Sequence, residues 1–171
     1  MIERKYLAHY IDANFGSGEV ANYRLGKDIE EYTIELNGEV EKKKNILGEQ
    51  SVTHKGYEPS SSVETFYPDY DDVLSQKLFD IANERKSGDD VRTTMVDVIL
   101  KPDGTVVSAY KEDVVIDVKS LGGATEGVNV PFEIHYAGNR VKGTFDTSTK
   151  TFTAESANAA STASTASTEE E

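Results

Sequence analysis

The histidines are the side chains in this sequence best suited to proton transfer or metal binding, and their spacing supports neither. His9, His54 and His135 are far apart, and no His-x-x-x-His or His-Glu-x-x-His motif occurs. His9 and His135 fall in alternating, strand-like segments, which favours partly buried structural histidines, whereas the polar surroundings of His54 predict a surface position. Because the chain has no cysteine, disulfides, thiolate metal sites, Fe–S clusters and cysteine nucleophiles are excluded.

A small acidic cluster precedes a helical pattern. A calcium loop would need acids at alternating positions, a central glycine and a terminal glutamate. Here Tyr70 interrupts Asp69 and Asp71, and the helical pattern begins at once after Asp72. The cluster is therefore predicted to cap a helix, and the acids at 89–90 are predicted to lie in a turn.

The glycine-rich segment 122–127 has the composition of a phosphate-binding loop but not its context. Such a loop needs a following helix and usually a lysine, whereas a strand-like run with an early proline follows here. A flexible loop between strands is predicted instead. The sequence thus predicts no catalytic, cofactor-binding or metal-ligating residues, no cofactor, and a protein that is not an enzyme.

Composition narrows the class of protein further. The 171 residues carry a net charge of −13, and residues 1–153 hold 27 of the acids against all 18 bases. Such a chain repels nucleic acid, so sequence-specific DNA binding is disfavoured. No apolar run reaches membrane-spanning length and the N-terminus has no signal-peptide pattern, so a soluble protein made in a cytoplasm is expected.

The chain is predicted to have two parts. Residues 1–153 show alternating patterns and turn signals, long enough for one domain with a hydrophobic core, and contain no domain-sized repeat. Residues 154–171 form a low-complexity, acidic Ser/Thr/Ala tail without a large apolar residue. Because that tail cannot offset its ordering entropy, it is predicted to be disordered, either as a linker or as a stub for attachment of another domain.

Most of the domain is predicted to form antiparallel strands, because apolar and polar residues alternate with a period of two. Asn37-Gly38 predicts a type I′ hairpin turn after a strand at 32–36. The strand segments expected further on are 93–100, 105–107, 114–118, 132–136, 141–145 and 150–153, with turns at 102–104, 137–139 and 146–149.

One segment has helical spacing instead. Leu74, Leu78 and Ile81 recur at about 3.6 residues, which predicts an amphipathic helix over about 71–87, with Gly88 as its stop. A mainly β domain, with two sheets and this one helix covering an edge or open end, is the economical architecture.

Two surface features leave alternatives open. The basic run Lys42, Lys43 and Lys44 lies among acids, which suits either contact with a neighbouring subunit or a plain solvated strand. The aromatic residues Tyr57, Phe66, Tyr67 and Tyr70 could be the ligand face of a non-catalytic β-sandwich binding or decoration module. Packing beneath the predicted helix is the favoured interpretation of these aromatics.

Six segments in a fixed order carry a resemblance that covers nearly all of residues 1–153: YRLGKD (23–28), EYTIELN (31–37), KNILGE (44–49), KGYEP (55–59), FY (66–67) and AGNRVKGTFD (137–146). Together they resemble the tail tube (major tail) proteins of tailed bacteriophages, of the type found in phages and prophages of Gram-positive bacteria. The tail at 154–171 is not part of this resemblance.

The resemblance implies a β-sandwich or half-barrel of two orthogonally packed antiparallel sheets flanked by one helix. It implies a structural virion protein that forms stacked hexameric rings and the conduit for DNA ejection. Stacking would use a loop around 40–58, in which the expected inter-ring contact residues are Lys42, Lys43, Lys44, Asn45, Ile46, Leu47 and Glu49.

The resemblance also implies partners and a location. The protein would bind copies of itself, the tape-measure protein, the tail terminator and distal tail or baseplate proteins, without membrane insertion. It would be made in the host cytoplasm and reside in the virion tail. DNA would pass through transiently and without specificity, and acidic side chains lining the channel would keep it from adhering.

Overall fold

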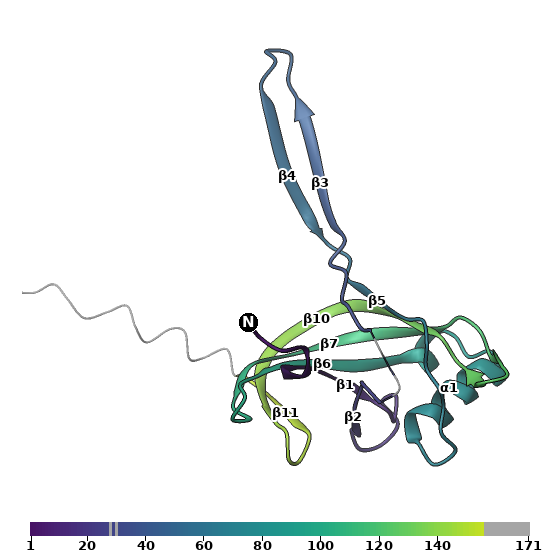
Figure 1. The fold of residues 1–171 in the computed structure, drawn as a ribbon. Coiled ribbons are helices and arrows are strands. Elements are labelled where there is room, and N and C mark those ends of the chain that lie inside the picture. The colour runs from purple at the N-terminus through teal and green to yellow at the C-terminus, as the bar shows by residue number, and fades with distance from the viewer. Residues whose placement is uncertain (28, 30, 156–171) are drawn as a thin grey trace, which may run out of the picture.

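A computed structural model describes residues 1–27, 29 and 31–155, and the predicted disordered tail lies outside these residues from 156 onward. The α-helix α1 (Val73–Glu84) and the 3-10 turns η1 (Arg4–Tyr6) and η2 (Gly88–Val91) accompany strands throughout the chain (Figure 1). The strands are β1 (Leu7–Asp12), β2 (Asn22–Arg24), β3 (Gly38–Lys44), β4 (Gln50–Tyr57), β5 (Ser60–Val63), β6 (Arg92–Leu100), β7 (Val106–Val118), β8 (Gly122–Ala124), β9 (Gly127–Asn129), β10 (Phe132–Asp146) and β11 (Thr151–Ala154).

Seven strands form one curled antiparallel sheet, the body of the molecule. Its order is β11-β10-β7-β6-β1-β2, and β5 pairs with the first part of β10. The long strand β10 bends as it runs, so that β5 and β11 lie along the same edge at its two ends (Figure 1). The predicted mainly β half-barrel with one helix is confirmed. The two packed layers of the half-barrel are joined by hydrogen bonds into one continuous sheet.

The curl gives the sheet a hydrophobic core on each face. Along β6, Met95 belongs to a larger core cluster with Leu74 and Leu78 of α1, whereas Val96 and Val98 belong to a smaller one. The smaller cluster is closed by β1 and the β10–β11 end, where the Tyr10 and Phe145 rings lie 4.5 Å apart. Since alternate residues of a strand point to opposite faces, β6 is buried on both sides and cannot show a clean alternation.

The predicted helix at about 71–87 is confirmed, and α1 is slightly shorter, Val73–Glu84. Asp72 is its N-cap, and the carboxylate accepts a hydrogen bond from the Ser75 backbone N–H at 2.9 Å. Leu74, Leu78 and Ile81 are buried, as their spacing predicts. Arg85, not the predicted Gly88, ends the helix in the left-handed conformation with φ 54°.

Two predicted turns are wrong. Asn37 has φ 46°, but Gly38 is the first residue of β3 and pairs with Tyr57, so no tight hairpin forms there. The predicted turn at 137–139 is a bulged stretch in the middle of β10, where the pairing with β7 shifts register. Glycine and asparagine accommodate a bulge as readily as a turn, because both need an unusual backbone conformation.

The glycine-rich segment also differs from prediction. Residues 122–129 form the short hairpin β8–β9 rather than an irregular loop. The acids at 89–90 lie in η2, which is consistent with the predicted turn. No helix among the described residues is long and apolar enough to cross a membrane.

Candidate assembly surface

The most conspicuous feature of the molecule is a two-stranded hairpin that stands away from the body. We call residues 38–57, formed by β3, β4 and their connecting turn, the arm (Figure 1). Seven residue pairs join its strands, and nearly every side chain is exposed. At about 3.4 Å per residue, seven residues span roughly 24 Å. An isolated two-stranded hairpin is only marginally stable in water, so an arm of this length is expected to gain stability from a partner.

One face of the arm is satisfied by its own charges. The Lys55 Nζ atom lies 3.3 Å from carboxylate oxygens of both Glu39 and Glu41, and the Lys43 Nζ atom lies 3.2 Å from Glu41. A bulge between Glu39 and Val40 places Lys55 on this face. Exposed pairs of this kind contribute little stability, but they leave the face well hydrated.

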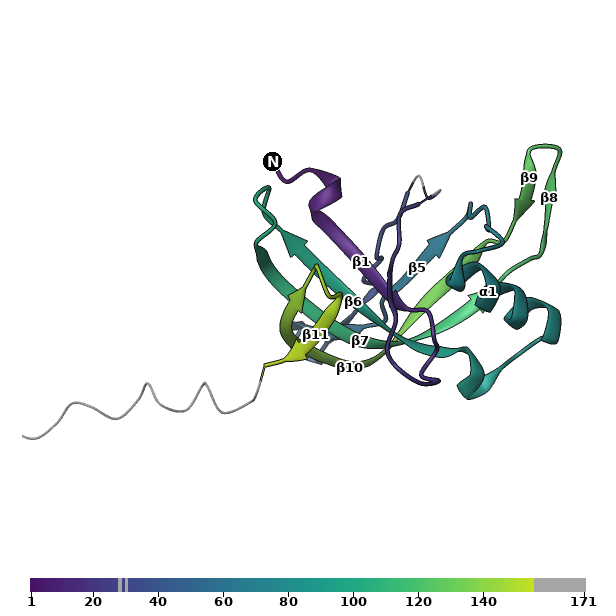
Figure 2. The ribbon, with the colours of Figure 1, turned by 90° about the horizontal axis from the view of Figure 1, so that it is seen from below.

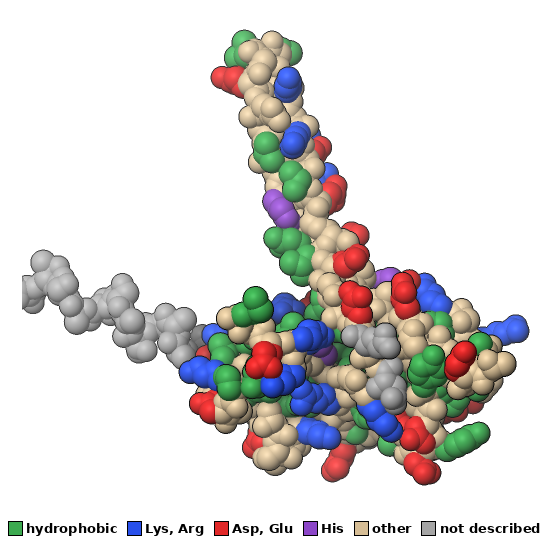
Figure 3. All heavy atoms as spheres, viewed as in Figure 1, with side chains coloured by type: hydrophobic (Ala, Val, Ile, Leu, Met, Phe, Trp, Pro, Cys, Tyr) green, Lys and Arg blue, Asp and Glu red, His purple; other side chains and the backbone are tan. Residues whose placement is uncertain are grey.

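The opposite face has no such compensation. It carries Val40, Val52 and Tyr57, which are 51%, 61% and 60% exposed, and the His54 ring lies 4.5 Å from the Tyr57 ring. Lys42 pairs across the strands with Val52 and therefore shares this face. Figure 3 shows hydrophobic side chains and a histidine along the arm, with acidic side chains gathered near its base.

The tip, residues 45–49, is ordered by one side chain. The Asn45 Oδ1 atom accepts hydrogen bonds from the Leu47 and Glu49 backbone N–H groups, each at 3.0 Å, and its Nδ2 atom donates to Glu49 Oε2 at 2.6 Å. Gly48 has φ 81°, a conformation that favours glycine. This turn presents Ile46 and Leu47 to solvent, 103% and 78% exposed. Two adjacent branched apolar side chains held at the end of an arm are the geometry of a contact element.

The structure brings all the predicted contact residues together on the arm. Lys42, Lys43 and Lys44 end β3, Asn45, Ile46 and Leu47 form the turn, and Glu49 precedes β4. Among the described residues, none forms an ion pair with Lys42 or Lys44. The length of the arm could not be predicted from the sequence. Both faces of the arm are exposed, so its strands lack the alternation of buried apolar and exposed polar residues that marks a strand in a sequence.

The predicted aromatic group does not pack together beneath the helix. Phe66 is buried and meets the Phe132 ring edge-on at 5.7 Å, as the packing interpretation expects. Tyr67 and Tyr70, which lie just before α1, are 44% and 93% exposed, and Tyr57 belongs to the arm. The prediction is wrong for these three tyrosines, because the segment before α1 runs over the surface and only Phe66 turns inward.

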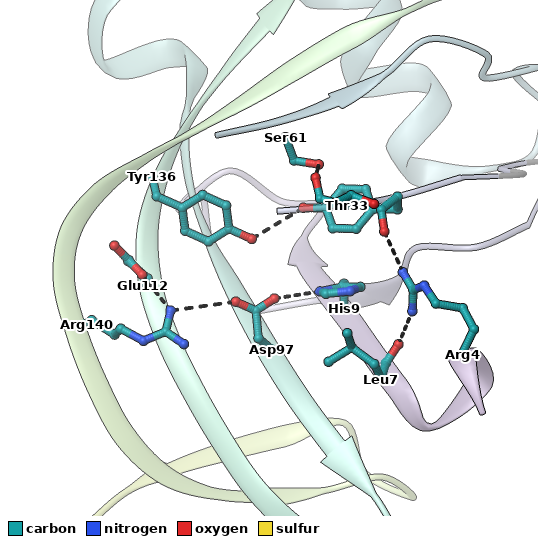
Figure 4. Close-up of polar contacts among 10 residues, drawn as sticks. Arg4, Leu7, His9, Thr33, Ser61, Asp97, Glu112, Tyr136 and Arg140 are labelled. Atoms are coloured by element: carbon teal, nitrogen blue, oxygen red, sulfur yellow. Dashed lines mark hydrogen bonds and ion pairs between the residues drawn. The ribbon is translucent and has the colours of Figure 1, made fainter. Parts of the chain in front are cut away.

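A buried polar network lies within the body (Figure 4). The His9 Nδ1 atom lies 2.7 Å from Asp97 Oδ1, and Arg140 donates to Glu112 Oε2 at 2.8 Å while lying 3.8 Å from Asp97 Oδ2. His9 is 3% exposed, which confirms its predicted structural role. The Tyr32 and Tyr136 hydroxyl groups meet at 3.3 Å.

This network ties distant parts of the chain together. Arg4 donates to the Leu7 and Tyr32 carbonyl oxygens, and the Ser61 hydroxyl donates to the Thr33 carbonyl oxygen (Figure 4). Burial raises the pKa of Tyr32 to about 12 and also raises the pKa of Tyr136. The network therefore fixes the segment that leads into the arm against the sheet.

A second cluster of titratable groups lies on the sheet surface. Ligand atoms of Asp117, Glu133 and His135 lie within 4.8 Å of one another. The Lys119 Nζ atom, however, is 2.6 Å from Asp117 and 2.8 Å from Glu133, so an ammonium group already sits between the carboxylates. The hydrogen bond with Asp117, and then that with Glu133, raises the pKa of Lys119. His135 is exposed, contrary to its predicted partial burial, whereas His54 is on the surface as predicted.

Two of the surface grooves differ sharply in the chemistry of their linings. One, of about 460 Å³, is lined by Ala13, Val20, Ala21, Asn22, Tyr23, Val73, Thr94, Val96, Lys111 and residues 149–152, and we call it the loop groove. The other, of about 470 Å³, is lined only by glutamate, serine and threonine, and we call it the acidic groove. Its glutamates are Glu31, Glu35, Glu64 and Glu133.

Comparison with known proteins yields similarity of structure only. No protein-family model matches the chain. No curated protein matches it by sequence. Among solved structures, the SPP1 tail tube, determined by solid-state NMR and cryo-EM, matches with a TM-score of 0.51 at 14% identity, covering 83% of this chain and 78% of that chain. The chain thus shares the fold of a phage tail tube subunit.

Two further matches have lower TM-scores. The tube-terminating cap of the anti-feeding prophage matches with a TM-score of 0.49 at 12% identity, covering 84% of this chain and 91% of that chain. A chain of the anti-feeding prophage baseplate matches with a TM-score of 0.44 at 9% identity, covering 80% of this chain and 89% of that chain.

Proposed function

We propose that this protein is a tail tube protein of a tailed bacteriophage, which stacks as hexameric rings into the conduit for DNA ejection. The observation that carries the proposal is the combination of an open half-barrel with a long, unpartnered arm, in a fold shared with the SPP1 tail tube. Since fold alone does not fix function, the physical properties of the surface must support the same role.

The sheet edges suit ring formation. β2 is a three-residue edge strand, and β10 pairs with β5 through Phe132–His135 and with β11 through Gly143–Asp146. Between those two partners, residues 137–141 have no strand alongside on that edge in the described part of the chain. Open edges are a liability in a monomer and are satisfied when neighbouring subunits pair across them, as in a ring that closes a barrel.

The arm suits ring stacking. One face satisfies its own charges, whereas the other exposes valines, Tyr57 and the tip residues Ile46 and Leu47. Buried against a neighbour, each large apolar side chain would contribute on the order of 1.5–3 kcal/mol. Residues 42–49 are accordingly the contact residues between successive rings.

The acidic groove suits a channel wall. Its lining contains no apolar side chain, so it offers nothing to a packed protein interface and stays hydrated. Among the described residues, none forms an ion pair with Glu31, Glu35 or Glu64. Glu133 is paired with Lys119, so three of the four carboxylates in this wall are uncompensated. Such a wall repels the DNA phosphates and prevents the counterion release that would hold DNA in place. A tube structure with mostly basic or neutral lumen residues would overturn this assignment.

The remaining features of the proposal follow from the tail tube role. The protein works without catalysis or cofactor in the virion tail, after synthesis and assembly in the host cytoplasm. Its partners are copies of itself, the tape-measure protein in the lumen, and the terminator and distal tail or baseplate proteins at the tube ends. The protein would be of the type found in phages and prophages of Gram-positive bacteria.

Removal of the arm tests the stacking role. Gly38 and Tyr57 are paired residues, so residues 39–56 can be replaced by Asn-Gly, which closes a tight hairpin. In negative-stain electron microscopy, wild-type protein should form long hollow tubes, and the truncated protein should stop at rings or monomers while keeping the circular-dichroism spectrum of a folded sheet. Tubes formed equally well without the arm would contradict the proposal.

A further inference from the structure

The tip of the arm needs a receiving surface, and the loop groove has the required position. In Figure 1 the arm rises from one side of the body, whereas the β1–β2 loop and the β10–β11 turn lie on the opposite side. Figure 2 views the body from that opposite side, and both segments line the loop groove. A contact between opposite sides of identical subunits is heterologous, so each added copy presents the same free surface to the next copy.

The lining of the loop groove suits branched apolar side chains. Val96 and Ala13 are 1% exposed at its floor, whereas Val20 and Val73, 59% and 47% exposed, lie uncovered around it. Such a groove is expected to gain stability when covered, because its valines otherwise face water. The exposed Ile46 and Leu47 of the arm are the matching element of the same chain.

An unsatisfied polar atom provides an independent sign of a missing partner. Asn22 lines the loop groove and is 7% exposed, and its Nδ2 atom donates to the Lys150 carbonyl oxygen at 2.7 Å. Its Oδ1 atom is buried and accepts no hydrogen bond from any described residue. An unpaired buried acceptor costs free energy that an arriving N–H group would recover.

One opposite-charge pairing is available between the tip and the groove, although Lys44 beside the tip carries the same charge as the groove and has no ion-pair partner among the described residues. Lys111 and Lys150 line the loop groove, and neither forms an ion pair within the described part of the chain. The tip carries one acid, Glu49, at its end of β4. An acid on the tip and cations in the groove favour one direction of insertion over the reverse.

Resting on the proposed tube-forming function, we propose that Ile46 and Leu47 at the arm tip of one copy insert into the loop groove of the next copy, with Glu49 beside Lys111 and Lys150. This contact joins successive rings. It specifies a tip-to-groove interface rather than a tip-to-tip one, and so fixes the polarity of the tube.

Engineered disulfides test the contact directly, because the natural chain contains no cysteine. The Leu47→Cys/Val20→Cys variant, assembled and then oxidised, should give a ladder of covalent multimers on a non-reducing gel. The matched control, Leu47→Cys/Val107→Cys, carries its second cysteine at a site that is 57% exposed and outside the groove lining. At least tenfold less multimer is expected from the control.

The outcomes separate the contact from the function. Tubes that form with no ladder for the groove pair, or with tip-to-tip dimers alone, would overturn the contact and leave the tube function standing. Absence of tubes, rings and cross-links at every concentration would overturn both.

A charge exchange provides a second test. Glu49→Lys should raise the critical concentration for assembly by about tenfold, and adding Lys150→Glu should bring it back toward the wild-type value. Loss of the Glu49–Asn45 hydrogen bond alone could not be repaired by a change at Lys150. Failure of the second substitution to rescue assembly would contradict the assigned ion pair.

Discussion

Two carboxylates, those of Asp97 and Glu112, lie in the interior of the body beside Arg140 and His9 (Figure 4). Buried carboxylates are tolerated only when they are paired and hydrogen-bonded. Arg140 compensates both, and its guanidinium also lies 4.6 Å from the centre of the Tyr110 ring. One cation of β10 therefore links side chains of β6 and β7 across the sheet.

Removing that cation should be costly. Arg140→Met removes the cation that lies 2.8 Å from Glu112 and 3.8 Å from Asp97, so the free energy of unfolding measured with urea should fall by about 2–3 kcal/mol. Arg92→Met is the control, because Arg92 forms its one ion pair within the described residues with the fully exposed Asp89 and should change stability by less than about 0.5 kcal/mol. Equal effects of the two substitutions would show that the network does not stabilise the fold.

The paired tyrosines predict a dependence on alkaline pH. The folded-state pKa of Tyr32, about 12, lies above its ordinary value of 10, so the folded protein holds this proton more tightly than the unfolded chain. The contribution of Tyr32 to the free energy of unfolding is therefore fully present below pH 10. It is lost as the pH rises toward 12, by about 1.4 kcal/mol for each pH unit. Urea titrations between pH 8 and 12 should show this decline.

A tyrosine-to-phenylalanine substitution provides the control for the pH dependence. Tyr32→Phe should lower stability at pH 8 by about 1 kcal/mol through loss of the hydroxyl contact with Tyr136. Above pH 10 it should decline less steeply than the wild type. Parallel curves for the two proteins would contradict the role assigned to Tyr32.

At the scale of elements, the sequence predicts a helix or strand best where only one face of that element is buried. Leu74 and Leu78 gave α1 through their spacing, and the turn after β6 followed from residues 102–104. The bulge within β10 could not be predicted from its Ala-Gly-Asn sequence, because only pairing with β7 distinguishes a bulge from a turn. The contact role of residues 42–47 and 49 stays a prediction made from the resemblance, whereas the length of the arm needed the structure.

Glycine at position 143 is required by the approach of β11 to β10. A Cβ atom there would overlap the Thr153 carbonyl oxygen and the Phe152 ring. Gly143→Ala should therefore lower the free energy of unfolding by about 1–3 kcal/mol and expose β11 to hydrogen exchange. Gly122→Ala, where no atom lies within 4 Å of the added group, is the matched control and should be nearly neutral. Unchanged protection of β11 in Gly143→Ala would contradict this assignment.

At the scale of the whole molecule, exposed apolar side chains and open sheet edges lie at several separate places on the subunit. The arm lies on one side of the body, and the β1–β2 loop and the β10–β11 turn, which line the loop groove, lie on the opposite side (Figures 1 and 2). Sheet edges remain at β2 and β10. Sequence alone could not reveal this distribution, since it depends on which strands end the sheet. In the proposed tube, heterologous contacts of two kinds, one around a ring and one between rings, would cover these surfaces.

Cryo-electron microscopy of the purified wild-type protein at high concentration tests the central claim most directly. The account predicts hollow tubes of stacked sixfold rings, with the arm of each subunit reaching the adjoining ring. A protein that stays monomeric at every concentration, or that assembles into particles without a central channel, would contradict it.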